Sequence, residues 1–221
     1  MPQVEHEYYD LSSGKGYYDG EVFDDRSTLN PYVTPVPHGE GTMQYDNGDV
    51  YRGFWKDGEF SGSGKYTTMS YEYDGDWANG KEQGRGKKTS KSGKVYEGWF
   101  VNGMREGGGT LTWSTGTSYT GSFAMDKIKG PGVGRWLGSA DVYRGAWNSS
   151  TEEPEGHGTM TYSNGDVYEG SFTAGKRNGR GSYTTATTKM VGSWNMGHKT
   201  GSFLVTDLAT GEKTKKHASA S

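Results

Sequence analysis

Aromatic, glycine and polar residues alternate along most of this chain. A tyrosine is followed two positions later by glycine and four positions later by tryptophan or phenylalanine, as in Tyr51, Gly53 and Trp55. Positions two apart share one face of a β-strand, and the positions between them, such as Arg52, are mainly polar. The pattern predicts strands with one aromatic face and one polar face.

The same pattern recurs in seven copies at steps of 22 to 25 residues. The tyrosine position, which we call the anchor, is Tyr51, Tyr73, Tyr96, Tyr119, Tyr143, Tyr168 and finally Met190. A Gly-x-Gly sequence follows eleven residues after most anchors, two residues late in the fifth copy because "NSSTEEPE" lengthens a turn, and with Phe203 in place of the second glycine in the seventh. Each copy therefore predicts a two-stranded hairpin.

Turns of the type "DNGD" at 46–49 join one copy to the next, so the copies predict a continuous meander. Asn-Gly between alternating strands favours a type I′ turn. Glycine beside a large ring leaves room for that ring to lie across the neighbouring strand, so the strand glycines are expected to be sockets for the rings. At about 4.8 Å per strand, fourteen or more strands predict a twisted rod about 70 Å long.

Composition supports a β-fold that is organised by aromatic residues. Leu, Ile, Val and Phe make up only about an eighth of the chain, but it contains 16 Tyr and 7 Trp and has a net charge of -3. The 38 Gly argue against helices. There is no Cys, and no signal peptide or membrane span is evident, which predicts a cytoplasmic rather than a secreted protein. The near-neutral charge argues against nucleic-acid binding.

The strand Tyr-x-Gly-x-Phe/Trp followed by Gly-x-Gly, at a period near 23, resembles the MORN repeat family. The resemblance implies an all-β fold, an elongated single-layer antiparallel meander of consecutive β-hairpins with an aromatic groove. It divides the chain into a degenerate N-terminal repeat and a proline-containing loop (1–37), an array of a half repeat and seven copies whose last one caps it (38–206), and a flexible basic tail (207–221).

Candidate chemistry is weak. "GSGKYT" at 62–67 lacks the first glycine and the hydroxyl residue of a P-loop, and "DNGD" lacks the length and closing Glu of a calcium loop. His38, His157 and His198 are far apart along a rod. We expect no enzyme activity, no cofactor and no metal.

The aromatic face is the candidate site. A single-layer sheet must either curl to bury its rings or expose them as a groove, and exposed aromatic grooves bind partners. The alternative for each ring is a role in the core alone. The groove residues are Tyr51, Trp55, Tyr73, Trp77, Tyr96, Phe100, Tyr119, Phe123, Tyr143, Trp147, Tyr168 and Phe172. Phe54 and Trp99 fall on the polar face and could form a second surface for a dimer or another partner.

The first functional hypothesis is a non-enzymatic scaffold that binds a helix or an extended segment of a partner protein in this groove. The resemblance implies a cytoskeletal, ciliary or membrane-associated assembly. A second hypothesis is a peripheral membrane adaptor for anionic phospholipids, to which Lys213, Lys215 and Lys216 would contribute weakly. A third is an accessory subunit of a phosphoinositide kinase or another enzyme. Neither the partner nor the oligomeric state follows from the sequence.

Overall fold

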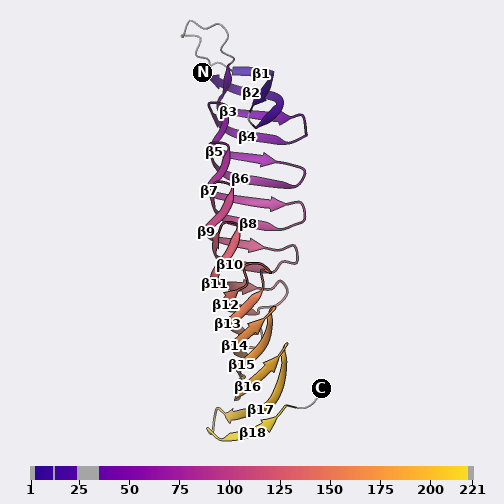
Figure 1. The fold of residues 1–221 in the computed structure, drawn as a ribbon, viewed down its shortest axis with the longest axis vertical. Coiled ribbons are helices and arrows are strands. Elements are labelled where there is room, and N and C mark those ends of the chain that lie inside the picture. Colours follow the sequence, from indigo (N-terminus) through magenta and orange to yellow (C-terminus); the bar gives the residue numbers. More distant parts are fainter. Residues whose placement is uncertain (1–2, 12, 24–34, 219–221) are drawn as a thin grey trace. The chain divides into compact units, whose positions relative to one another are not determined.

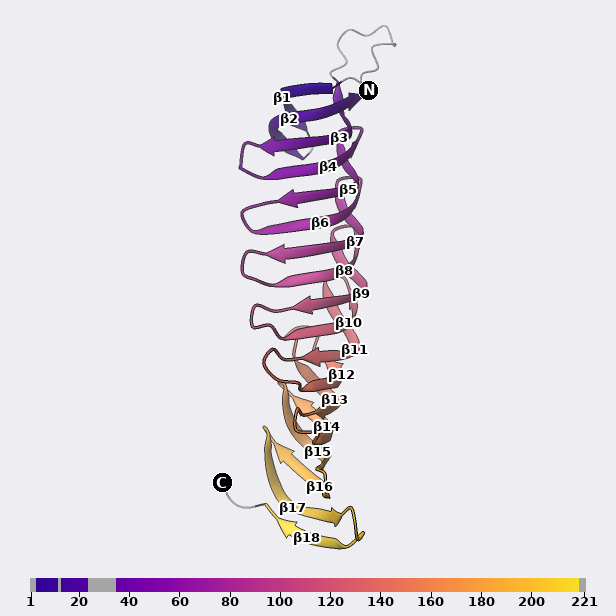
Figure 2. The same ribbon diagram turned by 180° about the vertical axis from the view of Figure 1, so that it is seen from behind.

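The computed structural model describes residues 3–11, 13–23 and 35–218, and these residues form strands and turns without a helix. Two compact units are present, Met1–Gly109 and Thr110–Ser221. Figures 1 and 2 show the strands lying side by side in chain order within each unit. The predicted all-β antiparallel meander is confirmed.

Nine strands belong mainly to the first unit, and each pairs with the next along the chain. They are β1 (Gln3–Leu11), β2 (Gly14–Phe23), β3 (Val36–Tyr45), β4 (Val50–Lys56), β5 (Glu59–Thr67), β6 (Tyr71–Ala78), β7 (Lys81–Ser90), β8 (Val95–Val101) and β9 (Met104–Thr112). The last of these strands ends in the second unit.

The second unit continues the meander in the same way. Its strands are β10 (Ser118–Ala124), β11 (Lys127–Arg135), β12 (Val142–Trp147), β13 (Pro154–Thr161), β14 (Val167–Thr173), β15 (Lys176–Thr184), β16 (Thr188–Asn195), β17 (His198–Asp207) and β18 (Lys213–His217). Each strand pairs antiparallel with its successor.

A ladder of paired glycines crosses each unit. In the first unit Gly41 pairs with Gly53, Gly53 with Gly64, and Gly64 with Gly75. A Cβ on Gly53 would lie 2.6 Å from the Ser63 carbonyl oxygen and 2.9 Å from the Tyr51 hydroxyl, so a side chain does not fit. The Tyr51 ring lies against the partner glycine, where a Cβ on Gly64 would lie 2.6 Å from its Cζ atom, which confirms the predicted sockets.

A hydrogen bond from the anchor hydroxyl explains why these positions are tyrosine and not phenylalanine. The Tyr51 hydroxyl donates a hydrogen bond to the Phe54 carbonyl oxygen (2.9 Å), and the other anchor tyrosines make the same bond three residues ahead. The register of β4 and β5 shifts between Gly53 and Trp55 at a β-bulge. The hydroxyl therefore bonds a carbonyl next to this irregularity, where a buried oxygen without a donor would be costly.

The turns differ from the prediction in one respect. Asn47 in "DNGD" does not have a positive φ, whereas Gly48 does (86°), and the Gly48 N–H donates to the Tyr45 carbonyl oxygen. This is a type I turn followed by a left-handed glycine. The two-residue turns with positive φ at both positions lie at the other end of the hairpins, as in Asp57 (52°) and Gly58 (80°).

The seventh copy and the C-terminal segment depart from the regular repeat. In the seventh copy the ring of Phe203 lies against Gly192, in the socket that Met190 does not fill. The predicted mobile tail differs from the structure, since Lys213–His217 form β18 and pair with β17. An Asx-type turn makes this return, in which the Asp207 carboxylate accepts the backbone N–H groups of Ala209 and Thr210. The proline-containing loop lies largely outside the described residues, at 24–34.

Candidate functional site: a tryptophan groove in the second unit

The predicted groove residues form the aromatic core. Every one of them is between 0 and 8% exposed: Tyr51, Trp55, Tyr73, Trp77, Tyr96, Phe100, Tyr119, Phe123, Tyr143, Trp147, Tyr168 and Phe172. Their rings meet mostly edge to face, for example Tyr73 and Trp77 with centroids 5.0 Å apart. The sheet therefore takes the first of the two predicted routes and buries its rings against each other, and a partner-binding role for these twelve residues stays a prediction.

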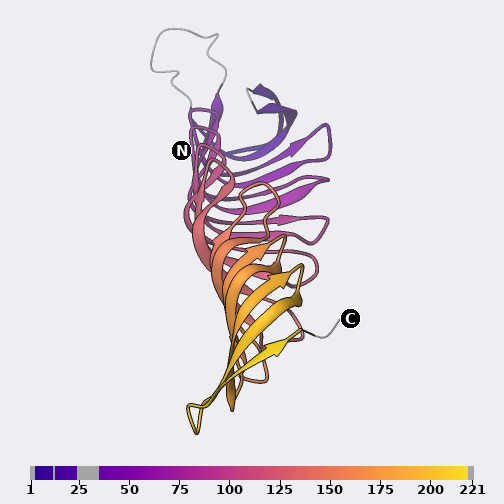
Figure 3. The same ribbon diagram turned by 60° about the horizontal axis from the view of Figure 1, so that its bottom comes forward.

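Strong curvature of the strands produces this burial. The backbone N–H of Trp113 donates to the Thr117 carbonyl oxygen in the turn before β10. Ser118 at the start of β10 pairs with Arg135, and Arg135 pairs with Val142, so this turn lies level with Asp141 along the strands. Six residues of straight strand, about 20 Å, would separate that level from Trp147. The rings of Trp113 and Trp147 are nevertheless stacked with centroids 6.1 Å apart. Figure 3 shows that the strands of the second unit, in orange, are curved.

One glycine outside the ladder makes room for this stack. The residue paired with the anchor is Tyr66, Met160 or Tyr183 in other copies, but Gly134 in the copy that begins at Tyr119. A Cβ on Gly134 would lie 2.7 Å from the six-membered ring of Trp147. The missing side chain lets the Trp147 indole lie over the backbone and reach Trp113.

The Trp147 ring lacks a hydrogen bond that Trp55 and Trp77 make. The indole N–H of Trp77 donates to the Gly64 carbonyl oxygen at 2.9 Å, and that of Trp55 to the Gly41 carbonyl oxygen at 3.3 Å. The buried Trp147 N–H has no such acceptor among the described residues, and the same is true of Trp194. For Trp147, the stacked position is therefore held at the expense of a polar contact.

Two turns from opposite ends of the sheet are joined at the same place. The indole N–H of Trp113 donates to the Glu152 carboxylate at 2.9 Å, across 39 positions of sequence. Glu152 lies in the lengthened fifth-copy turn and has a φ of 56°, which is uncommon for a residue other than glycine. Residues at other hairpin turns of the chain, such as Asp57 and Ala174, have a similar φ.

A cavity of about 330 Å³ opens beside this bond. Its walls are Trp113, Thr115, Thr117, Trp136, Trp147, Thr151, Glu152, Glu153, Pro154 and Gly175. Trp113 and Trp136 are half-buried, so their rings reach the surface. Three indoles and two carboxylates therefore surround one opening.

A second cavity of about 330 Å³ continues from the first, since both include Trp136 and Gly175. Its other walls are Asp141, Met160, Tyr162, Phe172, Lys176, Arg177 and Gly197. Arg177 donates to the Gly197 carbonyl oxygen and lies 5.4 Å from the centre of the Tyr183 ring. We call the two cavities together the tryptophan groove. Its charged walls are Glu152 and Glu153 in the first cavity and Asp141, Lys176 and Arg177 in the second.

The corresponding face of the first unit is filled by side chains. Phe60 stacks on Tyr51 with centroids 3.7 Å apart, and Glu82 takes the equivalent position one repeat later. Glu82 is 5% exposed and accepts a hydrogen bond from the Lys88 ammonium at 2.6 Å. Lys88 in turn lies 4.3 Å from the centre of the Tyr71 ring. In the second unit the residue at this position is Ile128, Pro154 or Arg177.

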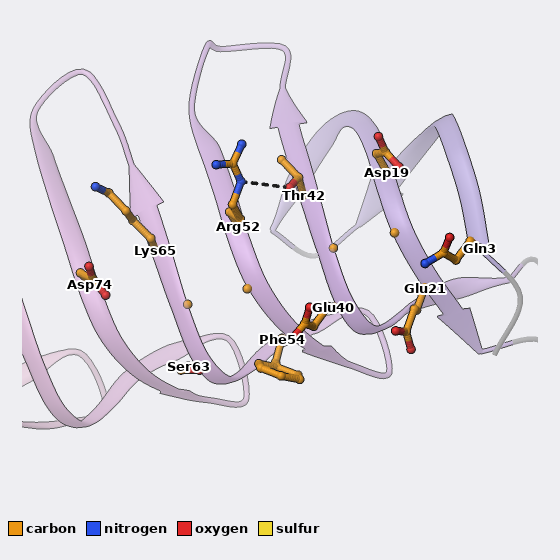
Figure 4. A pocket seen from close by; sticks show the side chains of 14 residues that line it. Gln3, Asp19, Glu21, Glu40, Thr42, Arg52, Phe54, Ser63, Lys65 and Asp74 are labelled. Carbon is orange, nitrogen blue, oxygen red and sulfur yellow. Dashed lines mark hydrogen bonds between the residues drawn. The ribbon is translucent and has the colours of Figure 1, made fainter.

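The polar face of the first unit carries a broad cavity of about 600 Å³ (Figure 4). Its charged walls have both signs and include Asp19, Glu21, Glu40, Arg52, Lys65 and Asp74. Phe54 lines it and is 42% exposed. Trp99 is 46% exposed but does not line it, and the Arg85 guanidinium lies 5.4 Å from its ring centre. The two residues predicted to form a second surface are exposed, and this cavity includes only Phe54.

The described residues contain no group of three or more His, Asp or Glu side chains that could hold a metal ion. They also contain no helix long and apolar enough to span a bilayer. Burial raises the pKa of Tyr45 and of Tyr143 to about 12, which keeps these hydroxyls protonated as hydrogen-bond donors at neutral pH.

Sequence reasoning identified Trp147 and Phe172 but missed Trp113, Trp136, Glu152 and Gly134. A signal was present, because Trp113 and Trp136 precede successive turns where other copies have Tyr45, Ser90 or Tyr162. The contact between Trp113 and Glu152 depends on strand curvature and has no local signal.

Comparison with known proteins gives one clear result. The family model for the MORN repeat matches residues 36–50, 51–69, 73–95, 96–118, 119–136, 153–167 and 168–187. It leaves out 137–152, which contains the irregular turn and Trp147. Comparison with curated proteins gives no match.

Two solved structures are distantly similar. One is the G-box domain of the microcephaly protein CPAP, with 9% identity, a TM-score of 0.44, and coverage of 96% of this chain and 99% of that one. The other is the TCP domain of SAS-4 (dCPAP) of Drosophila melanogaster in complex with a proline-rich motif of Ana2 (dSTIL), with 12% identity, a TM-score of 0.33, and coverage of 85% and 98%. The matched segments of the family model cover more than half of the sequence, and the chain belongs to the MORN repeat family.

Proposed function

We propose that this protein is a non-enzymatic interaction scaffold that binds a segment of a partner protein in the tryptophan groove. The binding would hold the partner within a larger assembly of the cytoskeletal, ciliary or membrane-associated kind that the repeat family suggests. The repeats supply a rigid frame, and the lengthened turn of the fifth copy supplies the site.

The groove itself carries the proposal. Trp113, Trp136 and Trp147 line one cavity of the second unit, and Trp136 also lines the cavity that adjoins it. Tryptophan contributes most to binding when a partner covers it, because its large ring loses little conformational freedom. A site of this composition suits a protein segment with apolar and charged side chains.

The test is affinity capture from native cells with a Trp136→Ala variant. Trp136 lines both cavities and is half-buried, so its loss should change the groove and leave the fold intact, which circular dichroism would check. Trp99→Ala is the matched control, since it removes an exposed tryptophan from the first unit. Loss of a dominant partner from the Trp136 variant alone supports the proposal. Equal capture by both variants and the wild type would refute it.

A second candidate function rests on β18. Lys215 pairs with Leu204, and Leu204 pairs with Val191, so an exposed basic residue adjoins two apolar residues that are 45% and 48% exposed. Such a face could contact anionic lipid, at about 1 kcal/mol per basic residue near the surface. We expect the wild type to bind vesicles that contain phosphatidylserine and a Lys213→Gln, Lys215→Gln variant not to bind them. Equal binding of the two proteins would exclude this contact.

A further inference from the structure

We propose that the cavity lined by Trp113, Trp136 and Trp147 binds the N-methylated ammonium group of a lysine side chain in the partner segment. The inference rests on the proposed function and names the chemistry of one anchoring contact. The ligand is a cation with an apolar surface, carried on an aliphatic stem.

The aromatic walls favour such a cation. The half-buried Trp113 and Trp136 line the opening, and the buried Trp147 stacks on Trp113. The faces of indole rings attract cations more strongly than those of other aromatic side chains. An unmodified ammonium is compact and strongly hydrated, and it needs several acceptors when it leaves water. Methyl groups replace those N–H bonds with apolar contacts while the charge remains. Indole and Pro154 surfaces can make contacts of that kind.

The charges at the cavity select the same ligand. The Glu152 carboxylate lies at the edge of the Trp113 indole, and the exposed Glu153 is on the same wall. Both carboxylates attract a cation. They would repel the phosphate that accompanies the ammonium of a choline lipid, because that phosphate lies only a few atoms away. A lysine side chain carries no such phosphate, so the acidic rim favours a protein source.

The neighbouring part of the groove fits a longer segment. The second cavity shares Trp136 with the first and has Lys176 and Arg177 on its wall. A peptide that places its methylated lysine in the first cavity can extend its neighbouring residues along the second.

The experiment uses the full chain with 15N-labelled tryptophan, whose seven indole N–H signals are observed by NMR. The probe is Nα-acetyl-Nζ-trimethyl-lysine methylamide. The comparators are the unmodified lysine compound and a neutral isostere with carbon in place of the charged nitrogen. We expect saturable shifts of the Trp113 and Trp136 signals, with both comparators binding about tenfold more weakly. Equal affinity of the neutral isostere or of unmodified lysine overturns the proposal.

Variants test the role of charge. Glu153→Gln should weaken the trimethyl-lysine probe severalfold, and Glu59→Gln, an exposed change in the first unit, should leave its affinity unchanged. An unchanged affinity in Glu153→Gln contradicts the proposal. Phosphatidylcholine vesicles provide a further arm, and shifts of the same indole signals by vesicles but not by the lysine probe would assign the cavity to lipid and overturn it.

The outcome can be separated from that of the proposed function. If Trp136→Ala loses the partner but no lysine probe binds, the groove binds protein and the methyl-lysine assignment is wrong. If the probe binds and the partner is captured equally by Trp136→Ala, the cavity recognises the cation and the scaffold proposal is wrong.

Discussion

The indole N–H of Trp113 donates a 2.9 Å hydrogen bond to the carboxylate of Glu152, 39 positions later in the chain. This bond joins two turns that lie at opposite ends of the curved strands of the second unit. It fixes one side of the cavity at which Trp113 and Trp136 reach the surface. The Trp113–Glu152 pair therefore connects the curvature of the repeats to the candidate site.

Trp113→Phe keeps a ring beside Trp147 and removes the indole N–H that donates a hydrogen bond to the Glu152 carboxylate. We expect it to lower the free energy of unfolding by about 1 kcal/mol, the usual net value of such a bond at a partly exposed site. Urea denaturation followed by circular dichroism measures this change. Trp99→Phe serves as the control and should change stability by less than about 0.5 kcal/mol, because Trp99 is 46% exposed. Equal effects of the two changes would show that the bond contributes nothing.

The glycine ladder predicts a large difference between two Gly→Ala substitutions. A Cβ on Gly53 would meet the backbone of β5 and the Tyr51 hydroxyl, so Gly53→Ala should destabilise the first unit by about 3 kcal/mol or more. Gly108→Ala adds its methyl group to open space, and no left-handed φ opposes it. It should be neutral or stabilise the protein by up to about 1 kcal/mol. Thermal melting of both variants is the measurement, and a tolerated Gly53→Ala would contradict the socket.

The buried Glu82–Lys88 pair predicts a rescue by a double substitution. Lys88→Met removes the cation beside a carboxylate that is 5% exposed and should cost about 2 kcal/mol or more, somewhat less than a fully buried pair because Lys88 is a third exposed. Glu82→Phe with Lys88→Tyr reproduces Phe60 and Tyr66 of the preceding repeat and should restore stability. Chemical denaturation of the three forms tests this, and a double variant no more stable than Lys88→Met would show that the repeats are not equivalent here.

Stability should fall at high pH because buried tyrosines hold their protons. Burial raises the pKa of Tyr45 and Tyr143 to about 12 in the folded chain, against about 10 when unfolded. Above pH 10 the folded state therefore binds more protons than the unfolded state. The stability that these two tyrosines contribute is complete below pH 10 and is lost as the pH rises from 10 to 12. Melting temperatures measured from pH 8 to 12 should decline steeply in that window. Tyrosinate absorbance that titrates fully near pH 10 without unfolding would disprove the burial.

Much of this protein follows from its sequence alone. The spacing of Tyr51, Gly53 and Trp55 predicts a strand with one aromatic face, and the Gly-x-Gly sequences predict the partner strand and its sockets. These are local properties, because side-chain direction alternates along a strand and glycine lacks a Cβ in every conformation. The choice between exposed and buried rings was left open by the same pattern.

Only the tertiary structure decided where the surface opens. Curvature of the strands buries the twelve predicted rings, and the long turn of the fifth copy, Gly134 and the bond between Trp113 and Glu152 create the tryptophan groove. The β18 strand is a similar case, because its pairing with β17 rests on backbone hydrogen bonds that any polar segment can make. Sequence periodicity determines which face of a strand a residue occupies. Contacts between opposite ends of a curved sheet depend on the sum of many small bends, which no single repeat encodes.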